Sequence, residues 1–292
     1  MTNPPLTIRI RLIHGALQRL ADRAGADVLH VKGPAVAPEL LDTRTTTDPD
    51  TGEQVTVTVP RSSSDADLLV RPQHVERFLD EVTRHGWIRK TSFDNSSAFG
   101  HALNIYHPTL GNADVHRHFP GLGRGSFDAL WAERGSATLG HVECAVPSLT
   151  GQRLLLLLHS ARSGPGHPDT ERAWGRATDG ERAEVQALAE RLGAELGVAA
   201  AVGNLDDYRS HPEYLLWKHF RDGNPSRLDE WRARWRSAST LRAKATVLRN
   251  LAFFNRTLLE AELGHRPSRR EYVARLGRRW ATLGRELFRR RR

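Results

Sequence analysis

Residues 61–70, RSSSDADLLV, join two acidic side chains to a run of apolar residues. Leu68 and Val70 favour a buried strand, yet carboxylates are rarely removed from water without a partner. Because side chains two residues apart in a strand point to the same side, Asp65 and Asp67 are predicted to project from one face. Two acids on one face repel each other unless a cation lies between them, and such oxygen donors suit Mg²⁺ or Mn²⁺. The stretch therefore predicts a metal site, or else an acidic pair on a solvent-facing strand.

A third acid, Asp114, lies in residues 112–119, NADVHRHF, which also have the alternation of a strand. Its direct neighbours are apolar, so it shares its face with His116 and His118. If this strand lies beside the first, three carboxylates converge and can hold two divalent ions about 4 Å apart, as phosphoryl transfer requires. The two histidines then support the metal-binding carboxylates or face the acceptor; otherwise they lie on a solvated strand face.

Residues 31–35, VKGPA, supply a candidate phosphate-binding element. Gly33 is predicted to end a strand and open a short helix, so that its backbone and the helix N-terminus can approach a phosphate. Lys32 adds a full positive charge. Taken alone, the same residues favour a plain Gly-Pro turn that carries a surface lysine.

Taken together, these motifs resemble the uncharacterised nucleotidyltransferase family of the DNA polymerase beta-like superfamily. The similarity covers about residues 8–165: a strand followed by Lys-Gly and a helix, the motif Arg-x-x-x-Asp-x-Asp-Leu-Leu-Val, a helix that ends in glycine, and a later Asp-x-His. The resemblance implies a nucleoside triphosphate (NTP) substrate and a Mg²⁺ (or Mn²⁺) cofactor. It also implies that Asp65 and Asp67 bind both metals, that Asp114 completes the second metal site, and that Lys32 and Gly33 lie against the triphosphate.

Arg61 and Ser64 belong to the same implied site. Arg61 matches the family's arginine just ahead of the Asp-x-Asp and is expected to contact phosphate, although an exposed arginine at a strand start explains it equally well. Ser64 lies close enough to join in. Two departures from the superfamily pattern stand out. The Gly-Ser pair of the superfamily appears here as Gly33-Pro34, so the phosphate must be held differently. Residues 42–60 also lengthen the interval between Gly33 and the Asp-x-Asp motif.

The whole sequence predicts an α+β fold: a nucleotidyltransferase-type mixed sheet with flanking helices, followed by an all-helical domain. We place the catalytic domain at residues 1–147 and the helical domain at 148–292. In the first part we expect a helix over 8–24, a strand and turn over 26–34, a brief helix over 35–41, a hairpin-like insertion over 42–60, a strand over 64–71, a helix from Pro72 to Gly86, and strands within 86–93, 100–107 and 112–119, the last two joined by a turn at Gly111 and Asn112. In the second part we expect helices from residue 148 and over 181–196, 212–221, 225–237, 241–263 and 268–290.

The composition, with 39% hydrophobic and 26% charged residues, is that of an ordinary globular protein, so disorder is not expected. The N-terminus lacks the apolar segment of a signal peptide, and the longest aliphatic run, residues 154–159, is too short to span a bilayer. We therefore expect a cytoplasmic protein with no stable membrane insertion. The single cysteine, Cys144, excludes an internal disulfide and a cysteine-cluster metal site.

The formal net charge of +9, much of it from the last third of the chain, favours polyanionic partners. A genome that prefers arginine codons explains the charge equally well. Aromatic and basic residues interleave in the C-terminal part, as in residues 230–236, EWRARWR. Such patches can stack on bases and neutralise phosphates, so RNA is a possible partner, but helical spacing favours a core position for these aromatics. His159, on the first helix of that part, is either a boundary residue or a catalytic one.

The predicted activity is that of a metal-dependent nucleotidyltransferase. It would move a nucleoside monophosphate (NMP) from an NTP onto a hydroxyl or phosphate of a small-molecule or modified-peptide acceptor, as in the tailoring of natural products. Two alternatives remain: an RNA- or tRNA-directed nucleotidyltransferase of toxin-like type, and a non-catalytic nucleotide-binding protein on the same fold. Three acids that repel one another without metal argue against the last.

Overall fold

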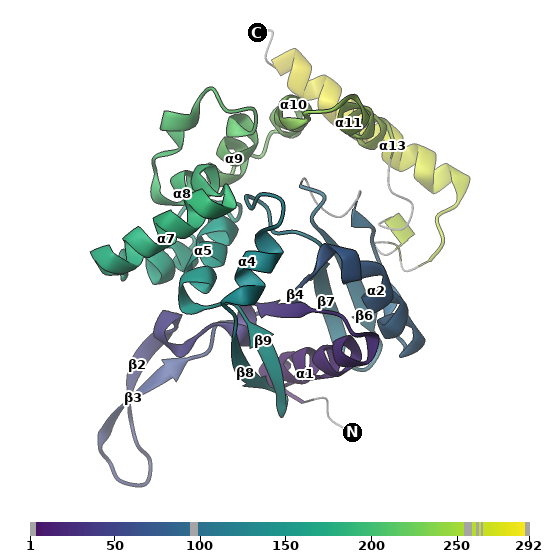
Figure 1. Cartoon of the computed structure of the whole chain (residues 1–292). Coiled ribbons are helices and arrows are strands. Elements are labelled where there is room, and N and C mark those ends of the chain that lie inside the picture. The colour runs from purple at the N-terminus through teal and green to yellow at the C-terminus, as the bar shows by residue number, and fades with distance from the viewer. Residues whose placement is uncertain (1–3, 94–98, 254–258, 261–262, 264, 290–292) are drawn as a thin grey trace.

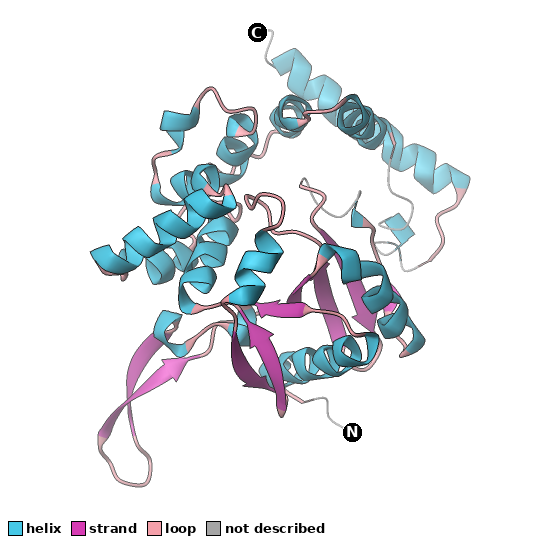
Figure 2. Cartoon of the chain, viewed as in Figure 1, coloured by secondary structure: helices cyan, strands magenta, loops and turns pink. Residues whose placement is uncertain are grey.

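The computed structural model describes residues 4–93, 99–253, 259–260, 263 and 265–289. It confirms the predicted α+β class: a mixed sheet with flanking helices is followed by a helical C-terminal part (Figure 2). In the described part of the chain, no helix is long and apolar enough to cross a membrane.

A five-stranded mixed sheet forms the centre of the N-terminal half (Figure 1). Its strands, in spatial order, are β1 (Val28–Val31), β4 (Ala66–Val70), β7 (Gly111–His116), β6 (Ala102–His107) and β5 (Ile88–Arg89). Strands β4 and β7 run parallel, whereas the other neighbouring pairs are antiparallel. The strand predicted within 86–93 is β5, which has only two residues. The turn predicted at Gly111 and Asn112 is wrong, because these residues begin β7.

Two amphipathic helices cover one face of this sheet. They are α1 (Leu6–Ala24) and α2 (Val75–Arg84), and a 3₁₀ turn at Pro72–His74 precedes the second. Their apolar sides pack on Leu68 of β4 and Val115 of β7 in one buried cluster. Both helices were predicted from their apolar spacing.

The opposite face carries the helix α5 (Leu149–Ser160). Ser148 caps it by accepting a hydrogen bond from the Gly151 amide, and the leucines at 154–158 are all buried. A helix that is apolar all round belongs in a core. These leucines share one cluster with Leu29 of β1 and Leu69 of β4, so the two predicted domains pack together there. Their boundary near residue 147 stays a prediction.

Short helices and turns extend this second layer. They are α6 (Pro168–Thr170), the π-helical turn η4 (Glu171–Gly175), α7 (Asp179–Leu192), α8 (Glu195–Val202), the 3₁₀ turn η5 (Leu205–Tyr208) and α9 (Tyr214–Arg221). The chain then continues into α10 (Arg227–Ser237), α11 (Leu241–Ala252) and α13 (Arg269–Arg289), which lie at the end of the molecule remote from the N-terminal strands (Figure 1). The helix predicted over 241–263 was too long, because α11 ends at Ala252; residues 254–258 and most of 261–264 lie outside the described residues.

Two hairpins lie outside the main sheet. The hairpin predicted over 42–60 is confirmed as β2 (Asp42–Thr47) and β3 (Gln54–Val59), which project from the body as an exposed ribbon (Figure 1). The second hairpin, β8 (Gly135–Leu139) and β9 (Val142–Val146), was not predicted, and neither was α4 (Ser126–Ala132). Cys144 is buried in β9, as expected for a small apolar residue.

Candidate functional site

The parallel pairing of β4 and β7 places Asp67 directly beside Asp114. Leu68 and Val115 alternate with them and point into the core under α1 and α2, so both carboxylates lie on the sheet face that α5 partly covers. His116 follows on the same face. One ligand atom from each of Asp67, Asp114 and His116 lies within 4.8 Å of the others, which is a spacing that could hold a metal ion.

Asp67 has the cationic and hydrogen-bonding partners, one of each, that a buried carboxylate requires. The Lys32 Nζ lies 2.5 Å from Asp67 Oδ1, and His116 Nε2 donates to the same oxygen at 2.8 Å. Burial alone would raise the pKa of Asp67, but the Lys32 ammonium and the His116 hydrogen bond hold it well below the usual range. Asp67 is therefore ionised under physiological conditions.

Lys32 reaches Asp67 from an unusual backbone conformation, with a φ of 59°. With its ψ of −170°, this is a conformation that residues other than glycine rarely adopt, and it costs about 1–3 kcal/mol. Its partners offset that cost, and strain of this kind often accompanies functional sites. The strand β1 thus ends by presenting a cation to the carboxylates.

Asp114 is held by the neighbouring strand β6. Asn104 is its cross-strand partner, and Asn104 Nδ2 donates to Asp114 Oδ1 at 3.0 Å. Burial, and then the negative charge of Asp67, raise the pKa of Asp114. Asn104 was not singled out in the sequence, although the hairpin alternation places it opposite Asp114.

Asp65 lies immediately before β4, at the edge of the same group. The hydroxyl oxygens of Ser63 and Ser64 each lie 3.4 Å from Asp65 Oδ1. Burial, and then the charges of Asp67 and Asp114, raise the pKa of Asp65 to about 6. Burial, and then repulsion from the neighbouring carboxylates, thus oppose the ionisation of Asp65 and Asp114. Hard oxygen donors with excess negative charge fit a divalent cation.

A shallow pocket of about 420 Å³ opens beside the carboxylates. It is lined by Lys32, residues 61–65, Asp67 and His159. The structure thus brings the predicted phosphate-site residues Lys32, Arg61 and Ser64 to the same pocket as Asp65 and Asp67. Asp114 lies next to this lining through its pairing with Asp67.

Gly33 follows Lys32 in the 3₁₀ turn η1 (Gly33–Ala35), with a φ of 48°. A Cβ at this position would lie 3.2 Å from the Ser63 Cβ, so the turn requires glycine. The short helix expected to open at Gly33 is a single 3₁₀ turn of three residues. Pro34 has no N–H, and the Ala35 and Val36 amides bond within the turn, so little of a helix N-terminus remains for phosphate.

Arg61 is anchored by a buried carboxylate that sequence analysis missed. Its Nε and Nη2 donate to the two oxygens of Asp169 at 3.1 and 2.7 Å, and Asp169 is fully buried. Arg172 Nη1 and His159 Nδ1 also donate to Asp169, at 2.9 and 3.1 Å. Burial would raise the pKa of Asp169, but these hydrogen bonds lower it. With two arginines bound, Asp169 acts as an anchor for Arg61 and is a poor metal ligand.

His159 and His118, two histidines weighed from the sequence, have different surroundings. His159 lines the shallow pocket, and burial lowers its pKa to about 4, so it is neutral at pH 7. His118 lies beyond the end of β7, in ring contact with His101. Its place in the pocket lining and its hydrogen bond to Asp169 mark His159 as part of the site.

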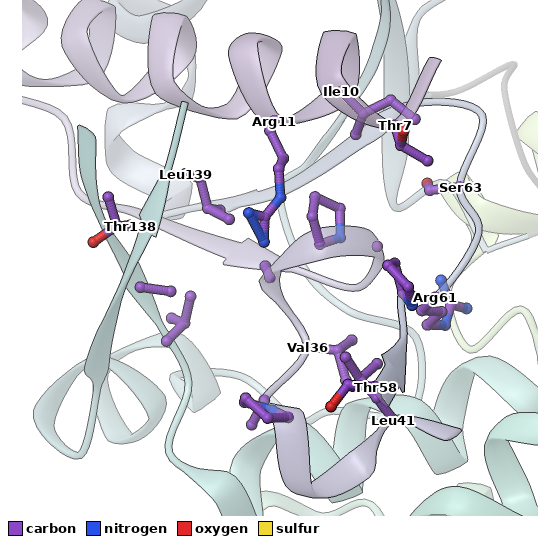
Figure 3. Close-up of a pocket in the computed structure, with 18 of the residues that line it drawn as sticks. Thr7, Ile10, Arg11, Val36, Leu41, Thr58, Arg61, Ser63, Thr138 and Leu139 are labelled. Atoms are coloured by element: carbon purple, nitrogen blue, oxygen red, sulfur yellow. The ribbon is translucent and has the colours of Figure 1, made fainter. Parts of the chain in front are cut away.

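A larger cavity of about 730 Å³ adjoins the pocket (Figure 3). The two share Arg61 and Ser63 as lining residues. Arg11 extends into the cavity from α1, and Leu139 of β8 closes the side opposite Ser63 (Figure 3). Its mostly apolar lining and its volume suit a small organic molecule.

No protein-family model and no curated protein matches the sequence. Among solved structures, the chain is similar to a lincomycin-bound lincosamide antibiotic adenylyltransferase, with a TM-score of 0.32 and 11% identity, covering 59% of this chain and 92% of that one. It is also similar to an antigenic nucleotidyltransferase-like protein from Paracoccidioides brasiliensis, with a TM-score of 0.34 and 14% identity, covering 73% and 94% of the two chains. At such scores neither protein's properties carry over, so function has to be argued from this chain's own residues.

Proposed function

We propose that the protein is a metal-dependent nucleotidyltransferase that moves an NMP from an NTP onto a hydroxyl or phosphate of an acceptor. The observation that carries the proposal is the in-register pair Asp67 and Asp114, with Asp65 at its edge and Lys32 against it. The motif resemblance to nucleotidyltransferases points to the same chemistry.

Asp65, Asp67 and Asp114 are the proposed ligands of Mg²⁺ or Mn²⁺. When bound there, the metal would neutralise phosphate charge and lower the pKa of the attacking hydroxyl. His116 positions Asp67 through its hydrogen bond, and Asn104 positions Asp114. These two neighbours fix the carboxylates before any substrate arrives, which reduces the cost of reorganisation.

Lys32 and the serine hydroxyls are the proposed contacts of the triphosphate. Lys32 pairs with Asp67 and lines the pocket, so its ammonium can release Asp67 and bind a phosphate oxygen instead. Ser63 and Ser64 offer hydroxyl donors on the same lining. Arg61, fixed by Asp169, contributes a positive charge at the pocket wall. Gly33 lets the chain turn close beside Ser63.

The transfer itself forms one bond and breaks one. The acceptor oxygen bonds to the α-phosphorus as the bond from that phosphorus to the bridging oxygen breaks, and pyrophosphate leaves. Asp65, the carboxylate at the edge of the group, is placed to accept the acceptor's proton. Lys32 is placed to offset the charge that develops on the leaving pyrophosphate. Positioning and charge neutralisation supply most of the rate.

A small-molecule or modified-peptide acceptor is the first candidate, because the 730 Å³ cavity adjoins the site and has a mostly apolar lining. An RNA acceptor is the second candidate, and the basic C-terminal helices favour it. A non-catalytic nucleotide-binding role would leave the three converging acids without a purpose.

The test is to incubate the protein with each α-³²P-labelled NTP, Mg²⁺ and cell extract, and to follow which molecule gains label. Asp65→Ala/Asp67→Ala should abolish labelling, and so should Asp114→Asn, which keeps the side-chain volume. Asp50→Asn, on the exposed hairpin, is the matched control and should label like the parent. Equal labelling by the parent and the Asp65→Ala/Asp67→Ala variant would refute the proposal.

A further inference from the structure

Positive charge is concentrated at one end of the chain. Residues 226–292 contain 19 lysines and arginines against 6 acidic residues, a net charge of +13. Residues 1–225 contain 24 against 28, a net charge of −4. A uniform preference for arginine codons does not produce such a division, so the positive charge is specific to the C-terminal part of the chain.

The helices α10, α11 and α13 belong to this part, and we call the surface that they form the C-terminal basic surface. Helix α11 carries Arg242, Lys244 and Arg249 with no acidic residue, and it buries none of its side chains. Among the described side chains of α13, only Leu283 is buried. Two tryptophans are exposed there, Trp235 at 39% and Trp280 at 48%. The sequence favoured a core position for most aromatics of this part, and for Trp235 and for Phe253, at 59% exposure, that expectation is wrong.

A pocket of about 430 Å³ lies on this surface, between the turn before α9 and the helices α10 and α11. Arg209, His211, Arg236 and Lys244 line it together with Trp235. The Lys244 Nζ lies 5.4 Å from the centre of the Trp235 ring. Arg209 pairs with Asp206 at 2.8 Å, but within the described residues Arg236 and Lys244 have no carboxylate partner. The pocket therefore offers unneutralised cations beside an exposed aromatic ring.

We propose that the C-terminal basic surface binds single-stranded nucleic acid, with phosphates at Arg236 and Lys244 and a base stacked on Trp235. Cations that follow a phosphate backbone and aromatic rings that stack on bases are the two elements of such sites. The inference goes beyond the transfer reaction, because the surface contains none of the three aspartates. It would bind the nucleic acid whether or not that nucleic acid is the acceptor of the NMP.

An acidic membrane surface is the competing polyanion. A helix that lies on a membrane presents a continuous apolar face to the lipid. On α13 the exposed large apolar side chains of the described residues are Val273 and Trp280, and arginines lie between them. A concave pocket around one aromatic ring fits a nucleotide unit better than a flat bilayer.

The test is fluorescence anisotropy of a fluorescein-labelled 20-nucleotide RNA of mixed sequence, without NTP or metal. With about four phosphates neutralised, the slope of log affinity against log salt should be about −3, so affinity falls about 50-fold between 50 and 200 mM salt. Arg236→Gln/Lys244→Gln should reduce the slope by about 1.4. Trp235→Ala should weaken binding about tenfold or more at constant slope.

The matched control is Arg84→Gln/Arg124→Gln, which removes two exposed arginines from the N-terminal half. It should bind RNA like the parent, and circular dichroism should show all variants folded. If the control variant lost as much RNA affinity as Arg236→Gln/Lys244→Gln, net charge alone would explain the loss, and the proposed site would be refuted. Co-sedimentation with phosphatidylserine vesicles in the absence of RNA binding would assign the surface to membranes and overturn the proposal. Neither result bears on the labelling experiment, so the two proposals fail separately.

Discussion

The substitution Lys32→Met tests how far the Lys32 charge stabilises Asp67 in the proposed metal site. The ammonium of Lys32 lies 2.5 Å from Asp67, and the two side chains are only 11% and 6% exposed. Removing the lysine leaves a buried carboxylate with His116 as its remaining partner. Breaking a buried pair in this way costs about 3–5 kcal/mol. For 292 residues, at about 2.1 cal/mol/K each, the melting temperature should fall by about 5–8 °C.

A divalent cation should recover much of this loss, because it can take the place of the missing ammonium. At a free Mn²⁺ concentration of about 100 times its dissociation constant, binding stabilises the folded state by about 2.7 kcal/mol. Melting followed by differential scanning fluorimetry, with and without MnCl₂, should therefore show a rise of about 4 °C in the Lys32→Met variant. The rise in the parent should be smaller, since the metal competes with Lys32.

Two controls make this result decisive. Lys32→Met/Asp67→Asn should show no manganese-dependent rise, because the carboxylate that attracts the cation is gone. Lys218→Met removes a lysine from an exposed pair with Asp222 and should cost less than about 1 kcal/mol. An unchanged melting temperature in Lys32→Met, or the same manganese effect with and without the Asp67 carboxylate, would refute the reasoning.

Asp114→Asn should lower Mn²⁺ affinity at least about tenfold in calorimetric titration while the melting temperature holds, because the amide loses the charge but still accepts the hydrogen bond from Asn104. Asp169→Asn should destabilise the protein by about 3–5 kcal/mol in urea unfolding, because the largely buried Arg61 loses its charged partner, whereas Arg172 keeps Asp42. Replacing residues 43–58 by Gly-Gly should change the unfolding free energy by less than about 1 kcal/mol, since that hairpin is exposed. Acidification should remove the stabilisation that neutral His14 contributes: burial lowers the pKa of His14 from 6.5 to about 4, so between these values this site takes up a proton only in the unfolded state. The contribution of His14, about 3 kcal/mol, is complete above pH 6.5 and is lost towards pH 4, as urea midpoints over that range would show.

The central strands and their two covering helices could be predicted because their signals are local. Alternation in residues 64–71 and apolar spacing after Pro72 each reflect one element packing on one core. The Asp65–Asp67 pair and Asp114 could be identified for the same reason, since strand alternation fixes which way a side chain points. The parallel pairing that brings Asp67 beside Asp114 is long-range and had to be assumed.

The carboxylate that anchors Arg61 could not be predicted, because it comes from a distant part of the chain. Asp169 lies 108 residues from Arg61, and no periodic pattern marks it. The unusual backbone conformation at Lys32 is equally hidden, since a lysine gives no signal for a positive φ. The hairpin β8–β9 was missed because its strands carry few of the aliphatic residues that mark a core strand.

The most direct test is to measure Mn²⁺ binding by electron paramagnetic resonance, with a non-hydrolysable α,β-methylene NTP present and absent. The parent should bind Mn²⁺, and more tightly with the nucleotide, because its phosphates add ligands beside the carboxylates. Asp65→Asn/Asp114→Asn should lose both the binding and the nucleotide effect. Binding that is equal in the parent and in that variant would show that these acids do not form a metal site.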